Sequence, residues 1–221
     1  MRISRSYMNA LMNANKSASS KRRAFGRSNK TSASRYLVNT PTAGRTNKAN
    51  STMNIYQNMK SSAGDVQYAA SKLTSSGDNS LFAKAKESGD TTEVTKQVKE
   101  FVNQYNNMVQ NLRNGTSRVD NSYLNQLNSY ATMHRNALQA TGVTKRSDGT
   151  LAIDEKALKG ASLEQLQSAW GSSSSFAAKA GTTAAYVQSS AVSSLNSLVN
   201  NSYSNLLRNF GSSGSFFNFF S

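Results

Sequence analysis

The sequence lacks cysteine altogether and contains a single histidine and a single proline. The absence of cysteine excludes disulfides, thiolate nucleophiles and every cysteine-based metal site. His134 has no second histidine to pair with, which argues against a histidine-rich metal site and against a Ser-His-Asp enzyme. We therefore predict no catalytic residue, metal ligand, cofactor or small-molecule substrate, and no enzymatic activity. The scarcity of proline favours long helices, because a helix interior does not accommodate proline.

Hydrophobic residues are also scarce, at 37% of the chain, whereas Ser and Asn are abundant. This composition predicts a modest core flanked by segments that bury little surface. No stretch approaches the ~20 apolar residues that span a bilayer, so no transmembrane segment is predicted. The start of the chain has no apolar run of the kind found in an ordinary secretory signal peptide.

Acidic residues are missing from the first 50 positions, which hold eleven Lys or Arg. The net charge of the chain is +15, but outside these positions it is only +4. A segment with high net charge and few apolar residues does not bury enough surface to fold by itself. We therefore predict that residues 1–50 form a basic, disordered arm.

The densest charge run in this arm consists of Lys21, Arg22, Arg23 and Arg27. Such a run attracts nucleic acid or an anionic surface, but it is also typical of a solvated tail. No recognition helix, zinc finger or aromatic RNA-binding pattern accompanies it. Both interpretations stay open, and nucleic acid is the less favoured partner.

Two segments carry apolar residues at alternating spacings of three and four, the pattern of a helix that buries one face. In the first segment, from Ser51, they are Tyr56, Met59, Ala63, Val66, Ala70 and Leu73. In the second, capped by Asp90 and ended by Gly115, they are Val94, Val98, Phe101, Tyr105, Met108 and Leu112, with Val102 and Val109 beside them. We expect these helices to pack as an antiparallel, coiled-coil-like pair.

A third helix is predicted from about residue 121 to 140, with Gly142 closing it. His134 lies near its apolar face, where we expect a packed or surface-edge histidine. A pH-sensing role for this residue has no partner in the sequence to support it.

A β-hairpin is predicted over residues 143–154. Asp148 and Gly149 supply the tight turn, and Leu151 and Ile153 alternate along the second strand. Two short strands are marginal alone, so this hairpin must pack against the helices. Asp154 is expected to cap the turn that follows, and Ser162 and Gln165 have the spacing of a capping box.

The segment 172–221 is rich in Ser and Asn and follows a helical domain of residues 51–171. Its helix, predicted over about 176–209, carries an apolar stripe of Val192, Leu195, Val199, Tyr203, Leu206 and Phe210. A phenylalanine-rich tail ends the chain. The fold class expected is mainly α: an antiparallel helical bundle with one small β-hairpin.

Several of these residues resemble the C-terminal region of the flagellar filament cap family, hook-associated protein 2. The similarity covers about residues 98–171. It rests on Phe101-Val102-x-x-Tyr105-Asn106, then Gly142-Val143-Thr144, then Asp148-Gly149-Thr150-Leu151-Ala152-Ile153-Asp154-Glu155. In that family a long C-terminal helix pairs with an N-terminal helix, and the C-terminal helix expected here is short by comparison.

The resemblance implies a structural, helical-bundle protein of the bacterial flagellum. Such a protein is secreted by flagellar export and self-associates or binds flagellin or other axial proteins. The motif and core residues that it implies are Phe101, Val102, Tyr105, Asn106, Gly142, Val143, Asp148, Gly149, Leu151, Ile153 and Asp154. The alternative is a basic protein, cytoplasmic in location, whose arm contacts nucleic acid or an anionic surface.

Overall fold

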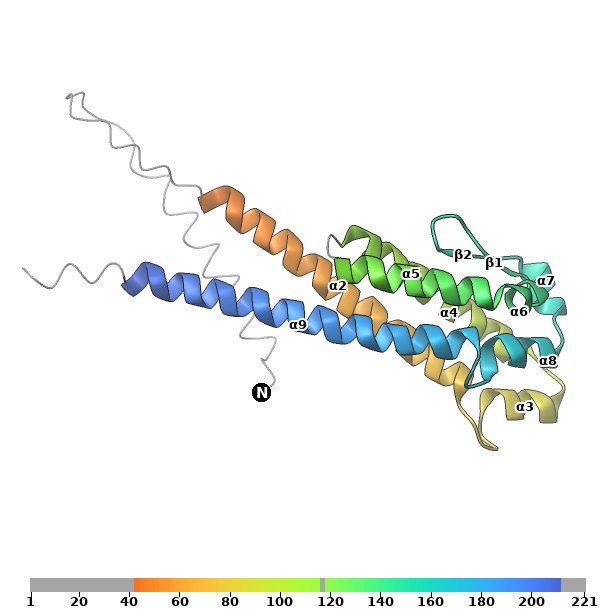
Figure 1. Ribbon diagram of the computed structural model, residues 1–221. Helices are drawn as coiled ribbons and strands as arrows, with labels where there is room; N and C mark the ends of the chain where they lie inside the picture. Colours follow the sequence, from red (N-terminus) through yellow and green to blue (C-terminus); the bar gives the residue numbers. More distant parts are fainter. Residues whose placement is uncertain (1–41, 116–117, 212–221) are drawn as a thin grey trace, which may run out of the picture. The chain divides into compact units, whose positions relative to one another are not determined.

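The computed structural model describes the backbone of residues 42–115 and 118–211, and the side chains of residues 50–115 and 120–201 (Figure 1). The basic run of the predicted arm and the phenylalanine-rich tail therefore lie outside the described residues. All structural statements below concern the unit formed by residues 41–221.

The described chain is mainly helical and contains one small antiparallel hairpin, which confirms the predicted fold class. Its elements, in order, are α2 (Thr42–Thr74), α3 (Leu81–Ser88), α4 (Thr92–Asn114), α5 (Arg118–Met133), α6 (Arg135–Ala140), β1 (Val143–Lys145), β2 (Leu151–Ile153), α7 (Glu155–Gly160), α8 (Leu163–Leu166), a π-helical turn (Gln167–Gly171) and α9 (Phe176–Gly211). The long helices α2, α4, α5 and α9 make the bundle, with α2 against α4 and α9, and α5 against the same two helices.

The helix pair predicted first, α2 and α4, is confirmed. We call the apolar residues that repeat at spacings of three and four the seam of each helix. Every seam residue predicted for α4 is buried, as are those of α2 from Met59 to Leu73. Asn111, near the end of α4, donates to the carbonyl oxygen of Asn58 at 3.4 Å and to Ser62 Oγ at 3.0 Å. The end of α4 thus lies against the middle of α2, and the two helices run antiparallel (Figure 1).

Two boundaries differ from the prediction. α2 begins at Thr42, so residues 42–50, which the sequence assigned to the arm, are helical. At the start of α4 the N-cap is Thr91, although Asp90 Oδ1 accepts the N–H of Thr92 at 2.8 Å. The hydroxyl of Thr92, and next this N–H, lower the pKa of Asp90.

The segment between α2 and α4 holds a helix that the sequence analysis did not predict. Ser80 caps α3 by accepting the N–H of Ala83 at 3.2 Å, and Phe82 is buried. The third predicted helix, in turn, is not continuous. It is interrupted at His134 and divided into α5 and α6.

α9 runs antiparallel to α2 and makes the most extensive helix contact of the fold (Figure 1). Gln67 Nε2 donates to Gln188 Oε1 at 3.0 Å, and farther along α2 a Cβ on Gly181 would lie 2.7 Å from the Cβ of Ala70. α9 has 36 residues and α2 has 33, and the bounds of α9 agree with the helix predicted over about residues 176–209.

The buried face of α9 is also not the predicted one. It consists of Phe176, Ala177, Ala180, Ala184, Val187 and Ala191, whereas Val192 is 36% exposed and Leu195 and Val199 are only half-buried. Small side chains let α9 approach α2 closely, and a search for large apolar residues passes over them. The other predicted stripe residues have side chains outside the described part.

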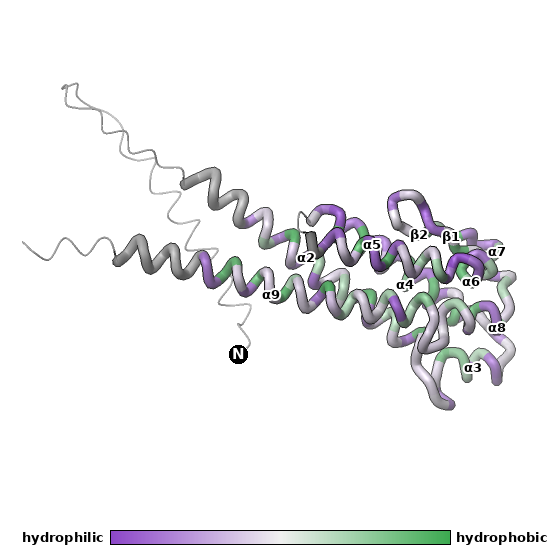
Figure 2. Tube along the Cα trace, in the orientation of Figure 1, coloured by the Kyte–Doolittle hydropathy of each residue, from purple (hydrophilic) through white to green (hydrophobic). Residues whose placement is uncertain are grey.

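Hydrophilic and hydrophobic residues alternate along the helices (Figure 2). Among the described residues, accordingly, none of the helices combines the length and the apolar character needed to cross a membrane.

Candidate functional site

The motif residues on α4 lie on one side of that helix. Phe101, Val102 and Tyr105 are buried, and Asn106 is half-buried beside them. A spacing of four residues places Phe101 and Tyr105 one above the other, with ring centroids 6.3 Å apart. This side of α4 contacts β2, so the helix and the hairpin motifs, which are far apart in sequence, meet.

Asn106 holds β2 through both polar atoms of its side-chain amide, Nδ2 and Oδ1. Its Nδ2 donates to the carbonyl oxygen of Leu151 at 2.9 Å, and its Oδ1 accepts the N–H of Leu151 at 2.7 Å. β2 belongs to a two-stranded sheet, so one of its edges has no neighbouring strand. Asn106 takes the place of that neighbour and satisfies two backbone groups that are costly to leave unpaired.

The turn of the hairpin is held by two further side chains of α4. The Tyr105 hydroxyl donates to the carbonyl oxygen of Gly149 at 3.3 Å, and Arg113 Nη1 donates to the carbonyl oxygen of Asp148 at 2.8 Å. Burial raises the pKa of Tyr105 far above its usual value, so the hydroxyl keeps its proton as a donor. We call Tyr105, Asn106, Arg113 and the backbone of residues 148–151 the hairpin dock.

Inside the turn, Asp148 and Gly149 play the parts predicted for them. Gly149 has φ +83°, a conformation that glycine adopts without strain. Asp148 Oδ1 accepts the Thr150 hydroxyl at 2.6 Å and the Thr150 N–H at 3.0 Å. The Thr150 hydroxyl and N–H lower the pKa of Asp148, and the charges of Arg113 and Arg146 act in the same direction.

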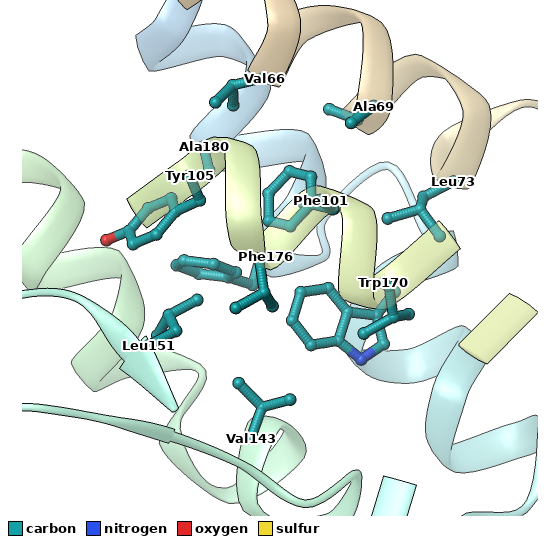
Figure 3. Close-up of a cluster of buried hydrophobic side chains, with 14 of the residues drawn as sticks. Val66, Ala69, Leu73, Phe101, Tyr105, Val143, Leu151, Trp170, Phe176 and Ala180 are labelled. Carbon is teal, nitrogen blue, oxygen red and sulfur yellow. The ribbon is translucent and has the colours of Figure 1, made fainter. Parts of the chain in front are cut away.

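A cluster of aromatic rings lies beneath the hairpin (Figure 3). The ring of Phe176, at the start of α9, is at centroid distances of 6.2 Å from Phe101, 5.4 Å from Tyr105 and 6.0 Å from Trp170. Val143 and Leu151, one from each strand, point toward this cluster. The hairpin thus buries one apolar residue from each strand against four rings.

The indole of Trp170 has a buried polar partner. Its Nε1–H donates to Thr141 Oγ1 at 3.1 Å, and both side chains are fully buried. The Ser175 hydroxyl donates to the carbonyl oxygen of Trp170 at 3.1 Å. These bonds fix the π-helical turn between the hairpin and α9.

Gly142 and Asp154 close the open end of the hairpin. Gly142 has φ +74°, and a Cβ there would lie 2.7 Å from the Cβ of Ala157. The N–H of Asp154 donates to the carbonyl oxygen of Gly142 at 2.8 Å. Asp154 Oδ1 accepts the N–H groups of Lys156 and Ala157, each at 3.0 Å, which confirms the predicted cap. Ile153, half-buried, pairs with Val143 in the sheet.

His134 lies at the edge of the aromatic cluster. Its ring meets that of Phe176 edge-on at a centroid distance of 6.3 Å. Partial burial, and next the charge of Lys179, lower the pKa of His134. This is the packed, surface-edge position that the sequence predicts.

The side chains of the hairpin dock hold the hairpin against α4. Each of its α4 side chains is hydrogen-bonded to the backbone of the hairpin, and none is directed at an open cavity. Within residues 42–115 and 118–211, His, Asp and Glu do not gather in a group of three that could hold a metal ion. A surface cavity of about 180 Å³ between α5, α6 and β1 is lined by Arg135 and Lys145 among others. No acidic residue lines it.

The sequence analysis named the motif residues but missed several of their partners. Arg113 lies seven residues after Asn106 and so on the same face of α4, a spacing that could have identified it. Thr150, which fixes Asp148, adjoins the predicted turn. Thr141 and Phe176 had no such signal, because their partners come from distant parts of the chain.

The predicted anionic-partner contact, Lys21, Arg22, Arg23 and Arg27, lies outside the described residues. Comparison of the whole chain with protein-family models, with curated proteins and with solved structures finds no match.

Proposed function

We propose that the protein is a structural component related to the bacterial flagellar filament cap. It is exported by the flagellar apparatus and acts by self-association or by binding flagellin or another axial protein. The observation that carries the proposal is the hairpin dock, in which the residues of the resemblance meet.

The dock supports the proposal because it gives the motif residues connected physical roles. Asn106 and Leu151 are 45 positions apart, yet their hydrogen bonds join the first part of the motif to the last. Tyr105 joins the same helix to Gly149. A resemblance that arose from composition alone would not require such residues to contact one another.

The pairing of α2 with α9 supports the proposal in a second way. The family that the sequence resembles joins a long C-terminal helix to an N-terminal helix. In this chain the last described helix, of 36 residues, lies along the first described one, of 33 residues.

A secretion experiment tests this function. The protein, with a small epitope tag, is followed in culture supernatants of a flagellated bacterium with an intact export apparatus and of a mutant lacking it. We expect the protein in the supernatant of the intact strain alone, with a cytosolic enzyme retained by both strains as the control for lysis. Equal release from the two strains would refute the proposal.

The alternative function rests on the charge of residues 1–50, which hold eleven Lys or Arg and no acidic residue. Here the arm contacts nucleic acid or an anionic surface while the bundle serves as a platform. Binding of duplex DNA would then fall linearly, on logarithmic axes, with salt concentration. Replacing Lys21, Arg22, Arg23 and Arg27 by Ser would reduce both the affinity and the salt slope, and unchanged binding would count against it.

A further inference from the structure

The two-stranded sheet has two edges, and α4 covers only one of them. At the edge of β2, the N–H and C=O of Leu151 are hydrogen-bonded to the side chain of Asn106. Lys145 lies opposite Leu151 in β1, at the other edge. Opposed residues of an antiparallel pair direct their backbone groups either toward each other or both outward. Because the groups of Leu151 point outward to Asn106, the N–H and C=O of Lys145 point outward from β1.

The hydrogen bonds of the hairpin agree with this direction. The N–H of Arg146 donates to the carbonyl oxygen of Thr150 at 2.8 Å, one residue beyond the pair of Lys145 and Leu151. Inward and outward pairs alternate along a strand, so Arg146 faces inward and Lys145 outward. Within the described part of the chain, no group bonds to the N–H or C=O of Lys145. Val143, the other outward residue of β1, is fully buried, so the accessible part of this edge is the exposed Lys145.

The cavity of about 180 Å³ lies beside this edge, and its apolar lining is Ala131, Leu138 and Val143, all buried. Small-molecule pockets have roughly 300–1,000 Å³, so this cavity suits one amino-acid side chain better than a cofactor. A residue that pairs with Lys145 has its side chain on the same face of the sheet as Val143 and Leu151. Both of these point into the molecule (Figure 3). The side chain of such a residue is therefore directed at the cavity.

The charged side chains at the cavity are cationic. Arg135 and Lys145 line it and are exposed, and no acidic residue lines it. Among the described residues, neither of the two takes part in an ion pair. The polar contact of Lys145 Nζ is with Asn128 Oδ1, at 3.5 Å. A carboxylate on the occupant would therefore meet two cations whose charge the protein leaves unmatched.

We propose that the edge of β1 binds an extended segment of a partner protein. An apolar residue of the segment enters the cavity, and an Asp or Glu close to it in sequence pairs with Arg135 and Lys145. The backbone of the segment then supplies to Lys145 the two hydrogen bonds that Asn106 supplies to Leu151.

The combination of a strand edge, a small apolar cavity and two cations favours this occupant over others. A helix has no free backbone groups along its length for Lys145, because they are bonded within the helix. Nucleic acid would match the charge of Arg135 and Lys145 but has no apolar side chain for the cavity. The proposal rests on described residues and does not depend on the flagellar function.

The test uses the full chain and short synthetic peptides, with fluorescence anisotropy as the measurement. The first peptide has a central Leu with Asp on both sides, between residues that favour strands. A second peptide carries Lys in place of Asp, and a third carries Gly in place of Leu. We expect each replacement to weaken binding about tenfold or more. Equal binding of the first peptide and either of the others overturns the proposal.

Methylation of the peptide backbone tests the strand pairing itself. Successive N–H groups of an extended segment point to opposite sides, so only alternate ones face β1. N-methylation at the central Leu and at the residue after it is therefore a matched pair of changes. We expect one of the two to weaken binding about tenfold, because it removes a backbone hydrogen bond to Lys145. Weaker binding after neither change, or after both, overturns the proposal.

Substitutions in the protein separate this site from the basic arm, which stays intact in every variant. The double variant Arg135→Gln and Lys145→Gln should bind the first peptide about tenfold more weakly. Lys84→Gln with Lys86→Gln, at exposed positions of α3, is the matched control because it removes the same charge. It should bind like the unmodified protein. Equal losses for the two double variants, or no loss for the first, would place the contact elsewhere and overturn the proposal.

Other occupants give distinct results, each of which overturns the proposal. Inorganic phosphate that displaces the first peptide at equal concentration would identify a site for small anions. Duplex DNA that binds more tightly than the peptide, and that needs Arg135 and Lys145 to do so, would identify nucleic acid. A dimer in analytical ultracentrifugation that the same double variant abolishes would identify a second copy.

Discussion

α4 and the free end of α9 carry the same sequence pattern but different degrees of burial. Both segments repeat apolar residues at spacings of three and four. The seam of α4 is covered by α2, α5 and the hairpin. Each seam residue from Val94 to Leu112 is at most 1% exposed. At the ends, where two helices pack alone, residues such as Ile55 and Leu195 stay half-buried. The pattern predicts which face is apolar, and the number of surrounding elements decides whether that face leaves water.

The hydrogen bonds of the two regions also differ, in the sequence separation of the residues that they join. In the hairpin dock, Tyr105 and Asn106 reach residues more than 40 positions away. Along the end of α9, Ser193 and Ser197 donate to carbonyl oxygens four residues earlier in their own helix, each at 3.0 Å. Bonds of the first kind specify one arrangement of elements, whereas bonds of the second kind fit any helix.

The largest difference between the regions should appear on truncation of apolar side chains. Phe101→Ala removes the ring that packs against Tyr105, Trp170 and Phe176, and should reduce the free energy of unfolding by about 3–5 kcal/mol. Ile55→Ala, at a half-buried position, should cost less than about 2 kcal/mol. Urea denaturation measures both. Similar losses for the two variants would mean that the comparison between the regions does not hold.

Backbone conformation provides a second test. Gly142→Ala forces a left-handed φ on alanine, which should reduce the free energy of unfolding by about 1–3 kcal/mol. The new Cβ would also overlap with Ala157 and with the backbone of Leu158. Gly77→Ala is the matched control, because Gly77 also has a left-handed φ but nothing lies within 4 Å of its Cβ position. Both free energies come from urea denaturation. The variant at 142 should be the less stable, and equal losses would show that the hairpin tolerates displacement from α7.

The third test concerns the hydrogen bonds of the dock. Asn106→Ala leaves the N–H of Leu151 without its side-chain partner and should cost about 1–3 kcal/mol. Asn107→Ala, at the exposed neighbouring position, should change stability by less than about 0.5 kcal/mol. Amide hydrogen exchange at Leu151 should accelerate in the first variant alone. Unchanged exchange there would mean that packing, not Asn106, holds β2.

The elements that could be predicted from the sequence are those whose signals lie within a few residues of one another. The seam of α4, the Asp148-Gly149 turn and the caps at Asp154 and Ser162 follow from spacing and from side-chain chemistry within a few residues. The break at His134 has no such local signal, because no proline or glycine lies there.

The face of α9 could not be predicted in the same way. A face made largely of alanine contributes little hydrophobicity, and it becomes a contact surface only because α2 approaches closely enough. Tyr105 and Asn106 were found as parts of a motif, but their hydrogen bonds to the hairpin were not predicted. Only the fold brings Asn106 to Leu151 and Trp170 to Thr141.

The smallest expected effect is a pH dependence confined to the bundle. The folded chain holds the pKa of His134 below the value of 6.5 that it has when exposed. As the pH falls from 7 through 6.5, the unfolded chain therefore binds a proton that the folded chain resists. The free energy of unfolding should decrease over this range and level off below the folded pKa, where both states are protonated.

Two measurements confine this effect to the aromatic cluster. His134→Gln should remove the slope between pH 5 and 7, while slopes at lower pH, where carboxylates such as Asp148 titrate, should persist.

Residues 42–64 and 191–211 contain no Asp, Glu or His. Exchange of their amide hydrogens, corrected for the intrinsic rate, should therefore report no local titration in this range. A variant that keeps the slope, or a protein that gains stability on acidification, would contradict the position of His134 against Phe176. Titration of amides beyond Ala191 would instead show that the ends are coupled to the bundle and that the two regions respond as one.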